Sequence, residues 1–442
     1  MNVISDVCYD FCQDYKTFLD TAKTERETVS YVMAKAESVG FRNLLNVKRE
    51  LVMGDKVYFN WMNKALALFV IGQEDPDSGI NFVASHTDSP RLDLKANPLY
   101  EDRGLVLLKT HYYGGIKKYQ WGTMPLALHG VIARKDGTLQ QVTMGEDPSD
   151  LVFYISDMPK HLSRKQMERK LEEGLQGEEL NLLCGGVPGE SGVLNHIIKT
   201  LAEQYAIDDS DFATAELEAV PAGKARDVGF DRCFISAYGH DDRACVFTSL
   251  RALLETSQPI HTAASLFMDK EEIGSVGATG MQSCFMENAV AELLDRLGGS
   301  SDLRLRRTLS RSKMLSADVV VGLDPTFADA FDPRNTAVMG GGTVLVKYVG
   351  SNGKKGSNDA NAEYLGAVRS AFAKHNVRWQ TGEMGKIDLG GGGTISHMAA
   401  RYGMSVVDCG VPLLSMHAPF ELAAKTDVYE TYRAYRAFYA EM

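Results

Sequence analysis

Histidine and acidic side chains stand at or near the ends of several apolar runs in this 442-residue sequence. The segments are SHTDSP with His86, GHDDR with Asp241, DKEEIGS with Glu271 and Glu272, and SMHAPFE with His417. Ligands in open α/β sheets gather at the carboxyl ends of strands, so these side chains are expected to meet. Asp318, in LSADVVVGLD, precedes an apolar run, and a carboxylate buried there should be paired or metal-bound.

Each of these signals is weak alone, because a histidine at a strand end or an acidic pair in a turn is most often structural. Together they provide two imidazoles and three carboxylates, a donor set that suits Zn²⁺, Co²⁺ or Mn²⁺. One carboxylate can bridge two ions about 3.5 to 4 Å apart, and such a pair lowers the pKa of a bound water towards about 7 and polarises a carbonyl group. The chemistry indicated is amide hydrolysis.

Two further carboxylates have positions that suit supporting roles. Asp88, two residues after His86, is placed to hydrogen-bond the imidazole and set its tautomer. Glu271 and Glu272 are adjacent, and neighbouring side chains on a strand point in opposite directions. One can therefore bind metal while the other faces the attacking water as a general base.

The elements expected to position these residues form an α/β domain. Apolar residues at helical spacing between about residues 5 and 40 predict two helices that end at Gly40. LNVKRELVM, KVYFNWM, ALALFVIG and GINFVASHTDS are then predicted as strands. After about residue 230, strand and helix patterns alternate, which favours a mixed, largely parallel sheet with helices on both faces.

The pattern differs between residues 96 and 228. LVLLKTHYYGG, ALHGVIARKDGTLQQVTMG and LVFYISDM are typical of short antiparallel strands with DG and GG turns. KQMERKLEEGLQGEEL is predicted to be a charged, solvated helix. We therefore expect a β-rich α+β domain at 96–228, inserted into a main domain formed by 1–95 and 229–442.

Composition excludes several classes of function. A net charge of −11 argues against binding to nucleic acid or to an anionic membrane, because either needs a basic face. The apolar runs fall short of the roughly 18 residues of a membrane span. Seven cysteines without a CxxC pair suit reduced thiols. The first residues lack a signal-peptide pattern, which favours a cytoplasmic location.

The motifs SHTDSP, a D-[DN] pair, EEIGS, SAD and a final MH, in this order, resemble those of the M18 aminopeptidases, whose best-known members are the aspartyl aminopeptidases. The resemblance runs over nearly the whole chain. It implies that two zinc ions are bound, with Asp241 bridging and Glu271 as the general base. The ligands it implies are His86, Asp241, Glu272, Asp318 and His417.

The same resemblance has implications for assembly and substrate binding. The inserted domain would be a dimerisation domain, and family members assemble into tetrahedral dodecamers. ISDMPKHLSR resembles a segment whose last histidine, here His161, contacts the peptide substrate of a neighbouring subunit. GTVLVKYVG resembles a segment whose lysine, here Lys347, contacts the substrate. The alternatives are a surface histidine and a lysine that snorkels at a strand end.

The sequence departs from the aspartyl aminopeptidases outside the metal motifs. Val321 and Asp324 replace two typical histidines, and Trp121-Gly-Thr-Met-Pro-Leu replaces a W-x-R-D-L segment. These departures concern the side-chain pocket, so the preferred N-terminal residue, acidic or neutral or basic, stays open. An M42-like aminopeptidase or an M20-like amidohydrolase is the alternative among enzymes. A noncatalytic shell or binding protein is the alternative outside them, but such a protein would be expected to lack Glu271 or a ligand.

Overall fold

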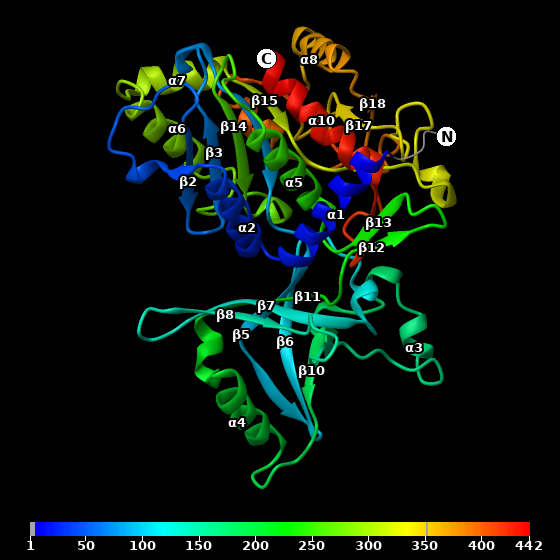
Figure 1. Ribbon diagram of the computed structural model, residues 1–442. Helices are drawn as coiled ribbons and strands as arrows, with labels where there is room; N and C mark the ends of the chain where they lie inside the picture. Colours follow the sequence, from blue (N-terminus) through cyan, green and yellow to red (C-terminus); the bar gives the residue numbers. More distant parts are fainter. Residues whose placement is uncertain (1–4, 351) are drawn as a thin grey trace. The chain divides into compact units, whose positions relative to one another are not determined.

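The computed structural model describes residues 5–350 and 352–442 and has a mixed α/β fold, as expected (Figure 1). The chain divides into two compact units. The larger unit contains the described residues up to Asp88 together with Ala225–Met416 and Glu421–Met442. The smaller unit contains Ser89–Lys224 and His417–Phe420. A short segment near the C-terminus thus joins the smaller unit, which the sequence did not predict.

The larger unit is built on a nine-stranded sheet in the order β1-β2-β3-β14-β4-β15-β19-β17-β18. At its centre, β4 pairs in parallel with both β14 and β15, and β15 pairs in parallel with β19. The carboxyl ends of these four strands therefore lie at one edge of the sheet. The strands are β1 Arg42–Asn43, β2 Lys56–Trp61, β3 Ala65–Val70, β14 Ala263–Met268, β4 Asn81–His86, β15 Lys313–Ser316, β19 Ser405–Gly410, β17 Thr343–Val346 and β18 Trp379–Thr381.

Helices cover both faces of this sheet (Figure 1). All six residues of β3 are buried, because alternate side chains pack into two different cores. On one face lie α1 Asp6–Thr21, α2 Glu25–Ser38, α5 His240–Leu254, α8 Ala362–Lys374 and α10 Lys425–Glu441. On the other lie α6 Phe285–Asp295, α7 Asp302–Arg311 and α9 Ser396–Ala400.

The predicted pair of N-terminal helices is confirmed, and each begins at a capping side chain. Ser5 caps α1, and Thr24 forms a reciprocal capping box with Glu27 at the start of α2. The predicted strand LNVKRELVM is wrong. The side chain of Asn43 instead accepts a hydrogen bond from the N–H of Leu45 and begins a 3₁₀ turn, so the chain leaves the sheet there.

A second sheet of the larger unit has five strands in the order β12-β13-β21-β20-β16. Its strands are β12 Arg226–Val228, β13 Phe234–Ala237, β21 Glu421–Ala424, β20 Pro412–Leu414 and β16 Val320–Val321. Asp241 lies shortly after β13, and Asp318 lies between β15 of the large sheet and β16 of this one. The two sheets together therefore position both carboxylates.

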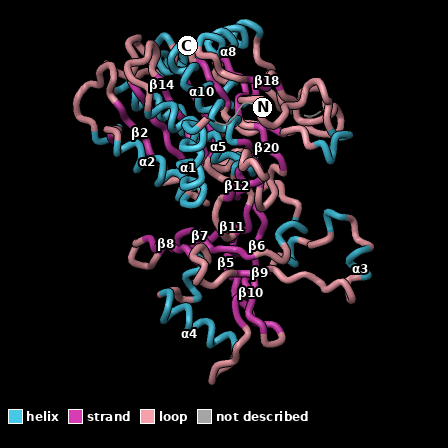
Figure 2. The backbone as a smooth tube through the Cα atoms, turned by 45° about the vertical axis from the view of Figure 1, so that its right-hand side comes forward, coloured by secondary structure: helices cyan, strands magenta, loops and turns pink. Residues whose placement is uncertain are grey.

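The smaller unit consists mainly of strands (Figure 2). These strands pair in the antiparallel sense. Strand β11 pairs with both β5 and β7, which closes a ring of six strands, and β8 extends from β7. Its elements are β5 Arg91–Asp102, β6 Leu105–Tyr113, β7 Pro125–Ala133, β8 Leu139–Met144, β9 Phe153–Tyr154, β10 Asn181–Gly185, β11 Ala215–Pro221, α3 Arg164–Met167 and α4 Val193–Tyr205.

The long charged helix predicted at KQMERKLEEGLQGEEL is wrong. Only α3 and two 3₁₀ turns, Leu171–Glu173 and Gly177–Glu179, occur there. Neither α3 nor these turns contains a buried residue, so no packing stabilises a longer helix. The longer helix of this unit is instead α4, which the sequence patterns did not predict. Over the residues that the structure describes, no helix combines the length and apolarity needed to cross a membrane.

Candidate metal centre

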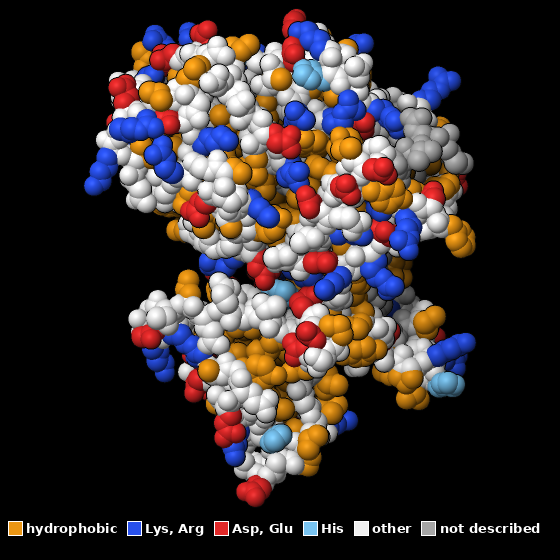
Figure 3. Space-filling model, viewed as in Figure 1, with side chains coloured by type: hydrophobic (Ala, Val, Ile, Leu, Met, Phe, Trp, Pro, Cys, Tyr) orange, Lys and Arg blue, Asp and Glu red, His pale blue; other side chains and the backbone are white. Residues whose placement is uncertain are grey.

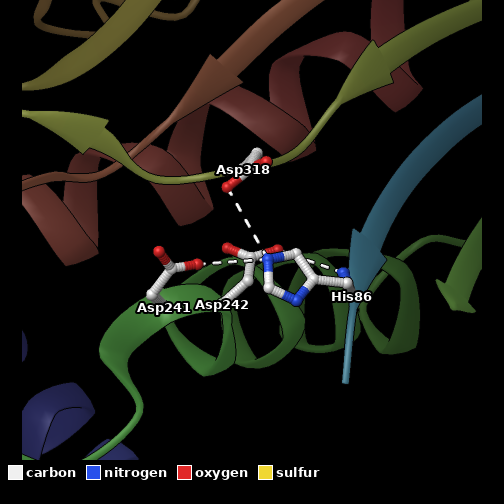
Figure 4. Close-up of side chains that lie close together, drawn as sticks. All are labelled: His86, Asp241, Asp242 and Asp318. Carbon is white, nitrogen blue, oxygen red and sulfur yellow. Dashed lines mark hydrogen bonds and ion pairs between the residues drawn. The ribbon is translucent and has the colours of Figure 1, made fainter. Parts of the chain in front are cut away.

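His86 is the last residue of β4 and is almost fully buried. Its Nε2 lies 3.1 Å from Oδ1 of Asp241 and 3.8 Å from Oδ1 of Asp318 (Figure 4). Its Nδ1 lies 3.0 Å from the main-chain oxygen of Asp88, which can only accept a hydrogen bond. A neutral ring that donates through Nδ1 carries its lone pair on Nε2, the nitrogen that faces the carboxylates.

Asp241 and Asp242 lie at the start of α5, where both have non-helical backbone angles and the peptide bond between them is cis. The N–H of Asp241 donates to Oε2 of the buried Glu421 at 3.0 Å. Oδ2 of Asp242 accepts a hydrogen bond from the N–H of His86 at 3.2 Å. The start of α5 is therefore tied to both β21 and β4.

Asp318 lies between β15 and β16, and its side chain is 12% exposed. Its main-chain oxygen packs against Gly410 at the end of β19, where an added Cβ would clash with that oxygen. Glycine is therefore required at 410 for the chain to pass so close. This contact helps to set where Asp318 stands relative to His86.

Glu271 and Glu272 do not lie on a strand as expected. They begin a 3₁₀ turn, Glu271–Ile273, that follows β14. The N–H of Glu271 donates to Oδ1 of Asp88 at 3.1 Å. The N–H of Glu272 donates to Oδ2 of the same carboxylate, also at 3.1 Å. Asp88 is fully buried and also lies 3.4 Å from Nδ1 of His86 through Oδ1. Its carboxylate thus holds the Glu271 turn, while its main-chain oxygen is closest to the imidazole.

Asp269 stabilises the loop that contains Glu271 and Glu272 through residues on either side of it. It is almost fully buried and accepts hydrogen bonds from the hydroxyl of Thr279 at 2.6 Å and from the N–H of Lys270 at 2.8 Å. Lys270 has a positive φ of 68°, which is uncommon for a residue with a side chain. Asp88 and Asp269 together therefore set the path of the loop that carries the two glutamates.

The electrostatics of the cluster favour a cation. Burial lowers the pKa of His86, but its interactions with the carboxylates of Asp241, Asp318 and Asp88 raise that pKa above its usual value. Burial raises the pKa of Glu271 to about 8; His86 opposes this rise, and nearby carboxylates such as Asp318 add to it. Burial also raises the pKa of Asp242. Burial therefore disfavours the charged forms of these carboxylates, and a bound cation would favour them.

The donor atoms fit a metal ion. His86, Asp241, Asp242 and Asp318 each offer one ligand atom, and these four atoms lie within 4.8 Å of one another (Figure 4). Imidazole nitrogen and carboxylate oxygen are ligands that zinc accepts. Asp242 was not predicted, because in the GHDDR motif only the first acidic residue was assigned. Its only signal in the sequence was the adjacent pair itself.

His417 belongs to the smaller unit, in the short segment His417–Phe420. It is partly buried, and its Nδ1 lies 2.9 Å from the main-chain oxygen of Gly115. As in His86, an Nδ1 that donates to a carbonyl leaves Nε2 as the nitrogen with the lone pair. The tautomer is thus the one that a metal ligand needs.

The residues predicted to contact substrate are both exposed. His161 lies in the segment between β9 and α3. Lys347 directly follows β17, and its main-chain oxygen accepts a hydrogen bond from Ala360. Asp324, one of the departures from the aspartyl aminopeptidases, caps its own 3₁₀ turn through a 2.9 Å hydrogen bond from Thr326. One oxygen of the Asp324 carboxylate therefore already accepts a hydrogen bond from its own turn.

Comparisons with known proteins find similarity to M18 aminopeptidases along nearly the whole chain. The family model for aminopeptidase I zinc metalloproteases (M18) matches residues 18–439. A probable M18 family aminopeptidase 1 of Clostridium acetobutylicum is 50% identical over 432 residues, which are 96% of this chain and 93% of that protein.

Solved structures show the same fold. The crystal structure of an M18 family aminopeptidase from Thermotoga maritima matches with a TM-score of 0.96 and 41% identity, covering 99% of this chain and 97% of that one. A structure described as the mApe1 dodecamer of S. cerevisiae matches with a TM-score of 0.78, covering 98% of this chain and 96% of that one. At 20% identity, this second likeness concerns the fold alone.

Proposed function

Because the chain belongs to the M18 family of zinc metallo-aminopeptidases, we propose that it hydrolyses the N-terminal peptide bond of peptides at the cluster around His86. The observation that carries this proposal is the convergence of His86, Asp241, Asp242 and Asp318 within 4.8 Å, at the carboxyl end of β4. An M42-like or M20-like enzyme is not favoured, since the M18 model matches nearly the full chain. A noncatalytic protein is less favoured because Glu271 is present.

We assign two zinc ions to the five residues His86, Asp241, Glu272, Asp318 and His417, with Asp241 as the bridging ligand. The closeness of His86, Asp241 and Asp318 supports their part in this assignment, and Co²⁺ or Mn²⁺ would suit the same donors. Bound zinc supplies Lewis acidity, which polarises the scissile carbonyl and makes water easier to deprotonate.

Glu271 acts as the general base. It removes a proton from the attacking water while the water oxygen bonds to the carbonyl carbon, and it then gives that proton to the nitrogen of the leaving peptide as the C–N bond breaks. The same carboxylate can do both, because it lies beside Glu272, one of the assigned metal ligands. Asp88 is a positioning residue, because it holds both the Glu271 turn and the ring of His86.

His161 and Lys347 are proposed substrate contacts, with His161 acting from a neighbouring subunit. Exposure of both side chains supports this, because neither is committed to the core of its own subunit. Lys347 offers a cation to a substrate carboxylate. Val321 and Asp324 stand where aspartyl aminopeptidases have histidines, so a preference that is broader than acidic residues, or shifted away from them, is proposed.

We propose that the smaller unit is the dimerisation domain, inserted at about 96–228 into a catalytic domain of 1–95 and 229–442, and that dimers assemble into a dodecamer. A cavity of about 450 Å³, lined mainly by aliphatic side chains, lies between α4 and the strands of this unit. Hydrophobic side chains also gather on the visible face of this unit (Figure 3). Apolar surface of this kind is typical of protein interfaces. A protein that shares the fold is described as a dodecamer, and we propose the same assembly here.

A cytoplasmic location is also proposed. The structure shows seven free cysteines, of which four are buried, and reduced thiols suit a reducing compartment.

The experiment that tests the function is hydrolysis of aminoacyl 4-nitroanilides by metal-free protein, alone and after addition of Zn²⁺, Co²⁺ or Mn²⁺. We expect no hydrolysis without metal and recovery with at least one of the three ions. The Glu271→Gln variant, measured with the same ions, controls for contaminating peptidases. Full activity in protein shown by elemental analysis to be metal-free would overturn the proposal.

A further inference from the structure

We propose that Asp242, which lies outside the five assigned ligands, is a positioning residue of the metal centre. One of its oxygens fixes the end of β4 that carries His86, and the other adds negative charge to the cluster. This inference rests on the proposed zinc-dependent function, since it concerns how the chain holds those ions.

The two oxygens of Asp242 have different surroundings. Oδ2 accepts the N–H of His86 at 3.2 Å, which ties the start of α5 to the end of β4. In the described part of the chain, no donor meets hydrogen-bond geometry at Oδ1, and this atom is buried. The Cys245 thiol, further along α5, also interacts with this carboxylate. The residue as a whole is fully buried.

The carboxylate also belongs to the cluster by distance. Its ligand atom lies within 4.8 Å of the ligand atoms of His86, Asp241 and Asp318 (Figure 4). A buried carboxylate oxygen without a hydrogen-bond donor is costly unless a positive charge lies nearby. A divalent ion held by His86 and the other two aspartates would supply that charge.

A purely structural tether is the competing explanation, in which only the hydrogen bond to His86 matters. The two explanations differ for Asp242→Asn. The amide has one oxygen and one NH₂ group, so it can accept the N–H of His86 but then turns its NH₂ group towards the cluster. The substitution thus keeps the tether and removes the charge. Asp242→Ala removes both.

Asp427 offers a matched control. It is fully buried in the first turn of α10, and its two oxygens accept hydrogen bonds from the N–H groups of Gly340 and Gly342 at 2.7 and 2.8 Å. Asp427→Asn therefore makes the same chemical change at a buried carboxylate at a helix start. This residue is not part of the donor cluster.

The test is the zinc affinity of the metal-free full-length protein, measured by competition with a chromophoric chelator. We expect Asp242→Asn to bind zinc about 10 to 100 times more weakly than the wild type, the usual effect of losing an outer partner of metal ligands. Asp427→Asn should stay within about threefold of the wild type. The rise in Tm on adding zinc should shrink in Asp242→Asn alone.

Zinc affinity of Asp242→Asn within threefold of the wild type, with only Asp242→Ala weakened, would overturn the proposal in favour of the tether. If metal-free Asp242→Asn does not fold, the rate at which zinc-loaded protein loses zinc to a chelator gives the same comparison. An unchanged rate would then overturn the proposal. Failure of the wild type itself to bind zinc or hydrolyse peptides would overturn the proposed function, and this inference with it.

Discussion

The carboxylate of Asp88 accepts the N–H of Glu271 at 3.1 Å, although the two residues lie 183 positions apart in the sequence. Its other oxygen accepts the N–H of Glu272. Asp88, two positions after His86 at the end of β4, thus holds the turn that carries the proposed base, Glu271. The position of the base and that of the histidine are therefore linked through one buried side chain.

Asp88→Asn should lower kcat by about 10- to 100-fold with little change in KM. The asparagine amide has only one oxygen, so it can accept only one of the two N–H groups, those of Glu271 and Glu272. The other N–H then faces the NH₂ group, and the side chain of Glu271 is no longer held in place. Asp427→Asn is the control, because that carboxylate also accepts two main-chain N–H groups. Steady-state kinetics at measured metal content would decide, and an unchanged kcat in Asp88→Asn would contradict the positioning role.

Glu271→Gln should lower kcat by about 10² to 10⁴ while metal content stays at the wild-type level. The amide keeps the shape of the side chain but cannot take a proton from water. Glu272→Gln is the paired variant and should instead weaken metal binding. Loss of metal in Glu271→Gln together with its retention in Glu272→Gln would show that the two glutamates have exchanged roles.

His161 can be tested by complementation between subunits. If His161 acts in a neighbouring active site, a mixture of His161→Ala and Glu271→Gln subunits should regain activity, because some sites in the mixed assemblies carry neither change. Subunit exchange must be shown separately by mass spectrometry of the mixed assemblies. Exchange without any recovery of activity would identify His161 as a surface residue.

Substrate preference can be tested at Lys347 and Asp324. Lys347→Met should reduce kcat/KM for peptides with N-terminal Asp or Glu more than for Leu, since it removes the cation that pairs with their carboxylate. If Asp324 faces the pocket, Asp324→Asn should shift the preference towards acidic residues, because the negative charge that repels them is removed. A strict Asp/Glu preference in the wild type would show that Val321 and Asp324 do not govern the pocket.

Stability should depend on pH through Asp427. Burial raises the pKa of its carboxyl to about 7, above the value of roughly 3.9 expected in the unfolded chain. Between these two values the folded protein binds the proton and the unfolded chain does not, so the contribution of Asp427 to stability falls as pH rises. Asp427→Asn should therefore cost less stability at pH 8 than at pH 5, measured by urea unfolding. An equal cost at both pH values would contradict the raised pKa.

Local sequence patterns predicted the buried strands and the edge of the sheet at which the site lies, because both depend on residues that are close together in the sequence. The apolar runs of β3 and β4 predicted buried strands, and the strand-end position of His86 predicted a site at the sheet edge. His86, Asp241 and Asp318 do lie together there. The strand-end argument works because β4 and β15 run in parallel, so the chain segments leaving them start from the same edge.

Tertiary structure alone decided which partner each buried polar group has. The sequence placed Asp88 beside His86, but only the packing of the Glu271 turn against β4 placed its carboxylate on two main-chain N–H groups. Asp242 joins the cluster because the start of α5 meets the end of β4, and His417 belongs to the smaller unit. Side-chain periodicity records which face of an element is buried, but hydrogen-bond partners distant in sequence depend on how the elements pack.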